Sequence, residues 1–128
     1  MRRVHAHDSP DSRWVYYNKS QTQPGLWRVP AGGGEESPVI EDLRAAFWGY
    51  WEIVDDGIYY LDRQEVGTVG VKYYLTFLSL PSRRTNQLLQ FPKRPFNSGL
   101  DISPDRRWLL FTQVDSSDTD IMLVENFR

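Results

Sequence analysis

The sequence predicts an all-β fold, and three observations support this prediction. First, "SPDSRWVYY" at residues 9–17 is repeated as "SPDRRWLLF" at residues 103–111, with Ser, Pro, Asp, Arg and Trp unchanged. Second, clusters of Ser, Pro, Gly and Asp interrupt the chain at short intervals, as is typical of short strands joined by turns. Third, 14% of the residues are aromatic, which favours strands, and only the short stretch "EDLRAAFW" suggests a helix.

An altered third copy of the motif lies between the other two. In "WEIVDDGIYYLD", the pair Asp56-Gly57 is a hairpin signal between two runs of strand-forming residues. Asp11, Asp56 and Asp105 are spaced by about 47 residues, a period found in propeller blades and solenoid units. We therefore predict a single domain of about three four-stranded antiparallel units, which are either propeller blades or solenoid units. The approximate unit boundaries are 1–43, 44–95 and 96–128.

Turn residues divide the first unit into four predicted strands. The breaks are "SPDS", "SQTQPG" and "AGGGEES". The strands are expected at Arg3 to His7, Arg13 to Lys19, Gly25 to Pro30 and Ser37 to Asp42.

The second unit also has four predicted strands, with "QEVGTVG" expected as a long hairpin tip and "PSRRT" as the next turn. These strands are expected at Ala46 to Val54, Ile58 to Arg63, Lys72 to Leu80 and Asn86 to Phe91. The third unit supplies three strands, at Gly99 to Ser103, Trp108 to Val114 and Ile121 to Glu125. The fourth strand of this last unit is therefore missing, and the prediction is eleven strands rather than twelve.

The Ser-Pro-Asp motif explains how each copy turns into a strand. Pro presets φ at the second turn position, while Ser and Asp side chains bond to nearby backbone N–H groups. The next position often requires a positive φ, where Gly is the best residue, yet Ser12 and Arg106 occupy it. A left-handed conformation at either residue would cost about 1 kcal/mol.

The bulk composition excludes several classes of protein. The formal net charge is −2, and the arginine pairs, Arg106-Arg107 among them, are scattered and are interpreted as solvated turn positions. Nucleic-acid binding by this chain alone is therefore not expected, because phosphate contacts need clustered Lys and Arg. There are no cysteines, no signal peptide and no apolar run long enough to cross a membrane. A cytoplasmic location is expected for the chain as written.

The repeats resemble those of a known family. Ser-Pro-Asp, an aromatic-aliphatic strand, a polar hairpin and a strand such as "DIMLVENF" or "GLWRVPAGG" resemble the repeats of TolB-like β-propellers, distant relatives of WD-repeat propellers. More specifically, residues 47–62 together with residues 99–128 look like the C-terminal end of propellers that follow a winged-helix domain in bacterial regulators, and residues 99–128 are the most specific match. The second copy is much altered, no Gly follows either Pro-Asp, and the chain has no winged-helix segment. The resemblance therefore does not extend DNA binding or transcriptional regulation to this chain.

The resemblance implies a partial β-propeller of about three four-stranded antiparallel blades, the last of which lacks its fourth strand. Such a chain cannot close a propeller alone, because closure needs about four to eight blades. The chain is then a fragment of a longer protein, or two copies form something like a six-bladed ring, or the blades form an open arc. We expect the last strand to be an exposed edge that pairs with another chain. This predicted interaction edge consists of Ile121, Met122, Leu123, Val124 and Glu125. Self-association or binding of a protein partner is therefore predicted, through this edge or the blade faces.

The stretch "FWGYW" at residues 47–51 offers an alternative site. Its rings would lie on an innermost strand, where Trp48, Tyr50 and Trp51 could stack on a sugar or peptide at the pore. Core packing between blades explains the same rings and is the favoured interpretation. Trp14 and Trp108, at equivalent places in two units, are interpreted as structural residues.

No cofactor or metal is predicted. His5 and His7 fall on one side of a strand and are weak candidates for metal ligands, but the chain has no other histidine. Asp115, Asp118 and Asp120 lie in an expected hairpin tip, where turn formation explains them better than calcium binding. The sequence contains neither a G-x-S-x-G nucleophile elbow nor a Walker loop.

The sequence thus favours a non-catalytic protein-interaction module built from β-propeller repeats. The alternative is a sensor that binds a small ligand or glycan through the aromatic residues at the pore.

Overall fold

The computed structural model describes residues 5–20, 22–43, 50–68, 70–93, 95–115 and 118–127. Within these ranges the description excludes the side chains of residues 5, 66, 95–99, 112–115 and 118–120. The described residues form eleven strands and no helix, so none of them lies in a helix that could span a membrane. The strands make three antiparallel sheets of four, four and three strands, which confirms the predicted all-β partial propeller.

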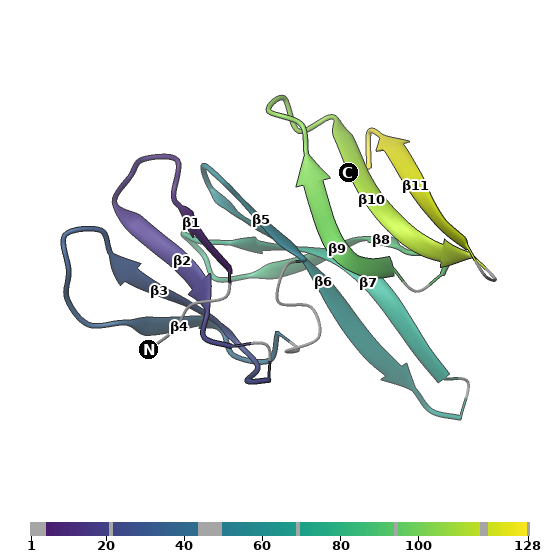
Figure 1. Cartoon of the computed structure of the whole chain (residues 1–128), viewed down its shortest axis with the longest axis horizontal. Coiled ribbons are helices and arrows are strands. Elements are labelled where there is room, and N and C mark those ends of the chain that lie inside the picture. The colour runs from purple at the N-terminus through teal and green to yellow at the C-terminus, as the bar shows by residue number, and fades with distance from the viewer. Residues whose placement is uncertain are drawn as a thin grey trace.

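Each sheet is a meander of strands consecutive in sequence, and we call the sheets blades 1, 2 and 3. Blade 1 contains β1 (His5–Asp8), β2 (Trp14–Asn18), β3 (Leu26–Pro30) and β4 (Ser37–Ile40). Blade 2 contains β5 (Trp51–Val54), β6 (Gly57–Val66), β7 (Gly70–Ser79) and β8 (Thr85–Gln90). Blade 3 contains β9 (Pro95–Ile102), β10 (Trp108–Asp115) and β11 (Asp118–Glu125). In Figure 1 the blades follow one another in a row, with blade 2 between the other two.

The strand boundaries differ most from the prediction at two hairpins and at the start of β9. The stretch expected as a long tip between β6 and β7 is mostly strand, because the ladder continues to the pair Val66 and Gly70. Likewise β10 and β11 pair as far as Asp115 and Asp118, so the expected acidic tip is mostly strand as well. β9 begins four residues earlier than expected, at Pro95, a position that proline tolerates at the start of a strand. Among the described residues β5 begins at Trp51, and the expected start of this strand at Ala46 lies outside them.

The distal part of the β6–β7 hairpin is a two-stranded ribbon. Within the described residues, β5 pairs with β6 only up to Tyr60, and β8 pairs with β7 only from Tyr74 onward. Leu61 N still donates to Tyr50 O, and Tyr73 O still accepts from Phe91 N. Beyond these bonds the described parts of the two strands form their ladder with each other. The ribbon extends away from the rest of blade 2 in Figure 1.

One apolar core joins the three blades. It combines buried residues from each sheet, including Tyr16 and Leu26 of blade 1, Ile58 of blade 2 and Leu109 and Phe111 of blade 3. Strand alternation explains this arrangement, because every second side chain of a strand points to the same face. The neighbours of these core residues point to the opposite face, and in blade 3 this opposite face is largely exposed.

The two Ser-Pro-Asp turns have the same structure. In the first, Ser9 Oγ donates to Asp11 Oδ1 at 2.6 Å and accepts from Trp14 N at 3.0 Å. In the second, Ser103 Oγ donates to Asp105 Oδ1 at 2.6 Å and accepts from Trp108 N at 2.9 Å. Hydrogen bonds from the serine hydroxyl, and then from the backbone, lower the pKa of both aspartates. The repeat in the sequence is therefore a repeat of one hydrogen-bonded turn.

The residue after each Pro-Asp is left-handed, as predicted. Ser12 has a φ of 62° and Arg106 a φ of 61°. Neither is glycine, so both turns carry the backbone strain of an L side chain in this conformation.

Candidate functional site

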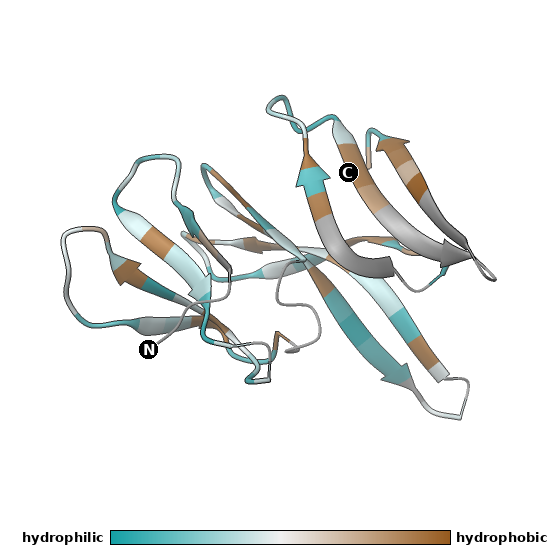
Figure 2. Cartoon of the chain, viewed as in Figure 1, coloured by the Kyte–Doolittle hydropathy of each residue, from teal (hydrophilic) through white to brown (hydrophobic). Residues whose placement is uncertain are grey.

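Blade 3 presents an apolar sheet face that the rest of the described chain leaves exposed. Four residues form this open face: Trp108 and Leu110 of β10, and Ile121 and Leu123 of β11. Their exposed fractions are 36%, 39%, 73% and 59%, respectively. Leu110 is directly paired with Leu123, so these two side chains are neighbours on one surface. Figure 2 shows apolar residues on β10 and β11 where the two strands run side by side.

The alternate residues of the same strands explain why these four are exposed. Leu109 and Phe111 are 0% and 2% exposed and belong to the core. Met122 and Val124 are partly buried and pack against it. Because this inward face is fixed by core packing, the register leaves the open face directed away from blade 2.

β11 is also an edge strand. Within the described residues it pairs only with β10, in the order β11, β10, β9. The predicted interaction edge, residues 121–125, therefore lies at the border of the sheet, with Met122 and Val124 turned inward and Ile121 and Leu123 outward. Its use as an interaction edge stays a prediction.

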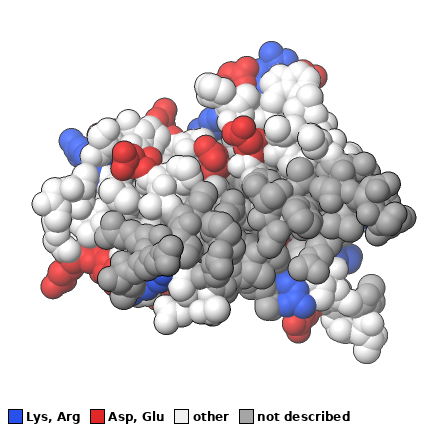
Figure 3. Space-filling view, viewed as in Figure 1, with Lys and Arg blue, Asp and Glu red and all other residues white. Residues whose placement is uncertain are grey.

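Charged residues border the open face. Glu125 of β11 is paired with Trp108 in the ladder and lies 3.4 Å from Arg107 Nη2. Asp101 of β9 is paired with Leu110 and is exposed. An apolar centre with a charged border is typical of protein-interaction surfaces. Figure 3 shows no single basic patch on the described residues of the side in view.

Arg106 fixes blade 3 against blade 2. Its Nη1 lies 2.8 Å from Asp56 Oδ1, and its Nε donates to Tyr59 Oη at 3.0 Å. The guanidinium carbon also lies 5.4 Å from the centre of the Tyr59 ring and 5.3 Å from that of the Phe77 ring. The sequence-based interpretation of Arg106 as a solvated turn position is therefore wrong. Its side chain reaches a partner 50 residues away in the chain, which no local pattern reveals.

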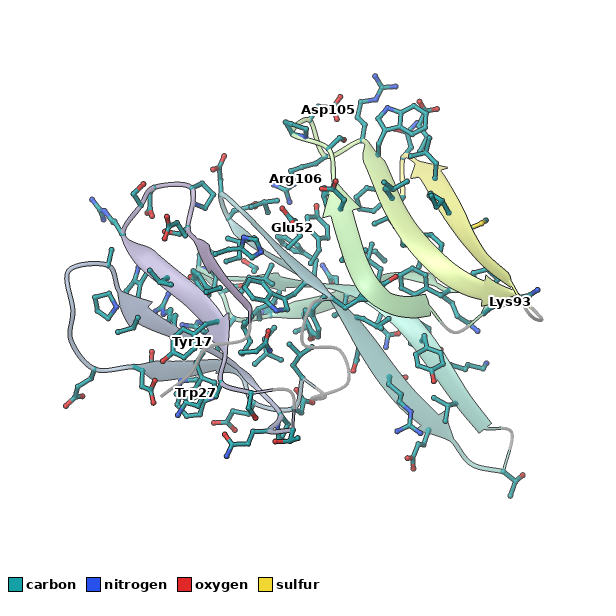
Figure 4. The ribbon with its side chains drawn as sticks, viewed as in Figure 1. Tyr17, Trp27, Glu52, Lys93, Asp105 and Arg106 are labelled. Carbon is teal, nitrogen blue, oxygen red and sulfur yellow. The ribbon has the colours of Figure 1, made fainter. Side chains whose placement is uncertain are left out.

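A small pocket lies beside Arg106 at the junction of blades 2 and 3. Its volume is about 260 Å³, and its lining includes Glu52, Asp55, Ser103 and Arg106. Burial, followed by the charge of Asp101, raises the pKa of Glu52 to about 7. Figure 4 shows Glu52 and Arg106 close together in the middle of the view, where blades 2 and 3 meet. The pocket therefore holds a carboxyl group that changes its charge near neutral pH.

The described aromatic residues among those predicted at the pore are buried. Tyr50 is 0% and Trp51 1% exposed, while Trp48 lies outside the described residues. Trp51 Nε1 donates to Asn18 Oδ1 at 2.6 Å, and the His7 ring meets the Trp51 ring edge-on, with the ring centres 5.4 Å apart. The Trp51 ring therefore packs between blades 1 and 2, and Tyr50 belongs to the shared core, which agrees with the favoured core interpretation.

The weak metal candidates remain unsupported. His7 contacts Trp51, and the side chain of His5 lies outside the description. The side chains of Asp115, Asp118 and Asp120 also lie outside it. No group of three or more potential metal ligands occurs among the side chains that the structure describes.

Comparisons with solved structures agree with this architecture. The chain is similar to TolB from Acinetobacter baumannii, with a TM-score of 0.69 and 11% identity over 95% of this chain and 29% of TolB. The chain has a TolB-like β-propeller fold. It is also similar to the tricorn protease, with a TM-score of 0.61 and 10% identity over 94% of this chain and 12% of the protease. The chain thus spans less than a third of either neighbour.

At these identities the likeness shows the fold alone. No family model and no curated protein matches the sequence. The predicted TolB-like resemblance is confirmed at the level of fold, while nothing tests the suggested relation to propellers that follow a winged-helix domain.

Proposed function

We propose that this chain is a non-catalytic protein-interaction module built from β-propeller blades and completed by self-association. The exposed apolar face of blade 3 carries this proposal. Of the five large apolar residues that are exposed among the described side chains, four lie together on this face. An apolar cluster of this kind on a soluble domain indicates a contact surface, because burying it on a partner is favourable.

The edge of β11 supports the same function. Along the described outer side of β11 no strand takes up the backbone N–H and C=O groups. Such an edge can accept a strand from another chain, and Ile121 and Leu123 add apolar contact area beside it. Face and edge together form one continuous surface on the same two strands.

The sensor alternative has no comparable support. A ring that binds a sugar or peptide needs one exposed face, and neither Tyr50 nor Trp51 has one. Ligand binding to the Trp51 ring would require blades 1 and 2 to separate.

Light scattering over a range of micromolar concentrations tests the proposal. We expect the wild-type chain to self-associate and Leu123→Glu to shift the equilibrium toward the monomer by at least about tenfold, because it places a charge in the apolar contact. Val71→Glu is the matched control, since Val71 is the remaining exposed large apolar residue and lies on the β6–β7 ribbon. A wild-type chain that remains monomeric throughout this range would contradict the proposal.

A further inference from the structure

Each blade has two faces, and the repeated motif aligns them from blade to blade. We call the face toward the next blade in sequence the front face. Trp14 and Tyr16 lie on the front face of blade 1, and the repeat aligns them with Trp108 and Leu110 of blade 3. The open face is therefore the front face of blade 3.

The front face of blade 1 is covered by blade 2. Tyr16 is 1% exposed and belongs to the shared core. Next to it, Asn18 Oδ1 accepts the hydrogen bond from Trp51 Nε1, and the His7 ring contacts the Trp51 ring. Trp14 is partly buried against the core, whereas its equivalent Trp108 is 36% exposed. The two tryptophans thus differ in burial because only one of their faces has a neighbouring blade.

The front face of blade 2 is covered in the same way by blade 3. Tyr59, directly paired with Glu52, is 1% exposed. Its ring lies 5.7 Å from that of Phe127, and its hydroxyl accepts from Arg106. The front faces of blades 1 and 2 are therefore each covered by the following blade, whereas the front face of blade 3 is open. This recurrence indicates what fits the open face: the rear face of another blade.

The rear faces that cover blades 1 and 2 are apolar. In blade 2 the rear face includes Trp51, Ile58 and Tyr60, and in blade 3 it includes Leu100, Leu109 and Phe111. The aligned positions in blade 1 are Ala6, Val15 and Tyr17.

The rear face of blade 1 has the composition of such a cover. Val15 is paired with Val29, and Tyr17 with Trp27, so four apolar side chains lie together on it. Val15, Trp27 and Val29 are partly exposed. Tyr17 is buried outside the core shared by the blades: its hydroxyl donates to Glu36, and the Lys19 ammonium lies 3.7 Å from the centre of the Trp27 ring, so charged side chains accompany the apolar ones on this face. Figure 4 shows Tyr17 and Trp27 close together on blade 1.

We infer that the open face of blade 3 binds the rear face of blade 1 of a second copy of this chain. The inference rests on the proposed function and names its partner and contact. The contact is head-to-tail, because two different surfaces meet. Two copies that dock at both ends bring together six blades, within the range of about four to eight found in closed propellers.

Engineered cysteines test this contact directly, because the chain has none of its own. In the repeat, Asp101 of blade 3 aligns with His7 of blade 1. Ala6, paired with Tyr17 on the rear face of blade 1, corresponds to Trp51, paired with Tyr60 on the rear face of blade 2. The observed contact of His7 with Trp51 therefore predicts that Asp101 lies near Ala6 of the second copy. Both residues are exposed. We expect a short bis-maleimide to link Asp101→Cys to Ala6→Cys when the two variants are mixed. Either variant alone is the matched control and should give little covalent dimer.

Three outcomes would overturn the inference. A covalent dimer formed by the Asp101→Cys variant alone would mean that the open faces of two copies meet each other. Self-association without the mixed linkage would place the contact elsewhere, and would leave the proposed interaction function standing. Absence of both linkage and self-association would refute the inference together with the proposed function. For the double variant Ala6→Cys/Asp101→Cys we expect a dimer, whereas a ladder of larger products would refute closure by two copies.

Discussion

The two strained turns allow one paired test of how blade 3 is attached to blade 2. Ser12 and Arg106 have φ values of 62° and 61°, so glycine relieves the same strain at both, about 1 kcal/mol or slightly more. Glycine also gives the unfolded chain more freedom, which costs about 0.5 kcal/mol. Ser12→Gly should therefore raise the free energy of unfolding by about 0.5 kcal/mol.

Arg106→Gly should have the opposite sign. It gains the same relief but loses the hydrogen bond to Tyr59, the ion pair with Asp56, and the contacts with the rings of Tyr59 and Phe77. The side chain of Arg106 is 23% and that of Asp56 57% exposed, so the ion pair itself contributes little. We assign about 2 kcal/mol to these contacts together, most of it to the hydrogen bond and the rings. The expected net loss is about 1.5 kcal/mol.

Urea unfolding followed by tryptophan fluorescence, at one fixed protein concentration, measures both variants. Arg106→Lys serves as the control, because it keeps the charge and the strain but loses the planar fork, and it should fall between wild type and Arg106→Gly. If Arg106→Gly stabilises the chain as much as Ser12→Gly does, the contacts of the Arg106 side chain contribute nothing to stability and the reasoning is refuted. A clear loss of stability in Ser12→Gly would refute the strain argument instead.

Three further predictions concern the interior. Gly57→Ala should cost about 2 kcal/mol or more, because a Cβ there would overlap the backbone oxygen of Leu78; urea unfolding checks it, and near-neutral behaviour would contradict the close packing. Trp51→Phe should cost about 2 kcal/mol, since the buried Asn18 Oδ1 loses its donor; a loss under about 0.5 kcal/mol would show that the bond is unimportant. Because the pKa of Glu52 is raised from 4.5 to about 7, the folded state holds a proton that the unfolded chain releases. The free energy of unfolding should then fall between these pH values and level off above them, and Glu52→Gln should flatten this dependence; identical urea midpoint profiles for both proteins would refute the assignment.

The repeated turn and the strand alternation made the fold predictable. Ser-Pro-Asp acts through its own hydroxyl and carboxylate on backbone groups within five residues, so the sequence alone contains the whole interaction. The same locality allowed the left-handed positions at Ser12 and Arg106 to be predicted. The number of strands followed once these turns were aligned.

Features that depend on the neighbouring blade could not be predicted in this way. Trp51 has the composition of a ligand-stacking residue, and only its contacts with Asn18 and His7 show that it is buried. Trp14 and Trp108 share one motif, yet the presence or absence of a covering blade determines their exposure. Strand ends in the β6–β7 hairpin were missed for another reason, because Gln64 and Glu65 are polar and show no alternation.

The β6–β7 ribbon has a consequence for motion. Gln64, Glu65, Gly70 and Val71 are exposed, and their strands are held by cross-strand hydrogen bonds with little burial. An isolated two-stranded ribbon is marginally stable in water. Its amide hydrogens should exchange with solvent far faster than those around Ile58 and Leu75, which are fully buried. The ribbon would then open and reclose as a unit of its own, at a rate unrelated to the melting of the propeller core.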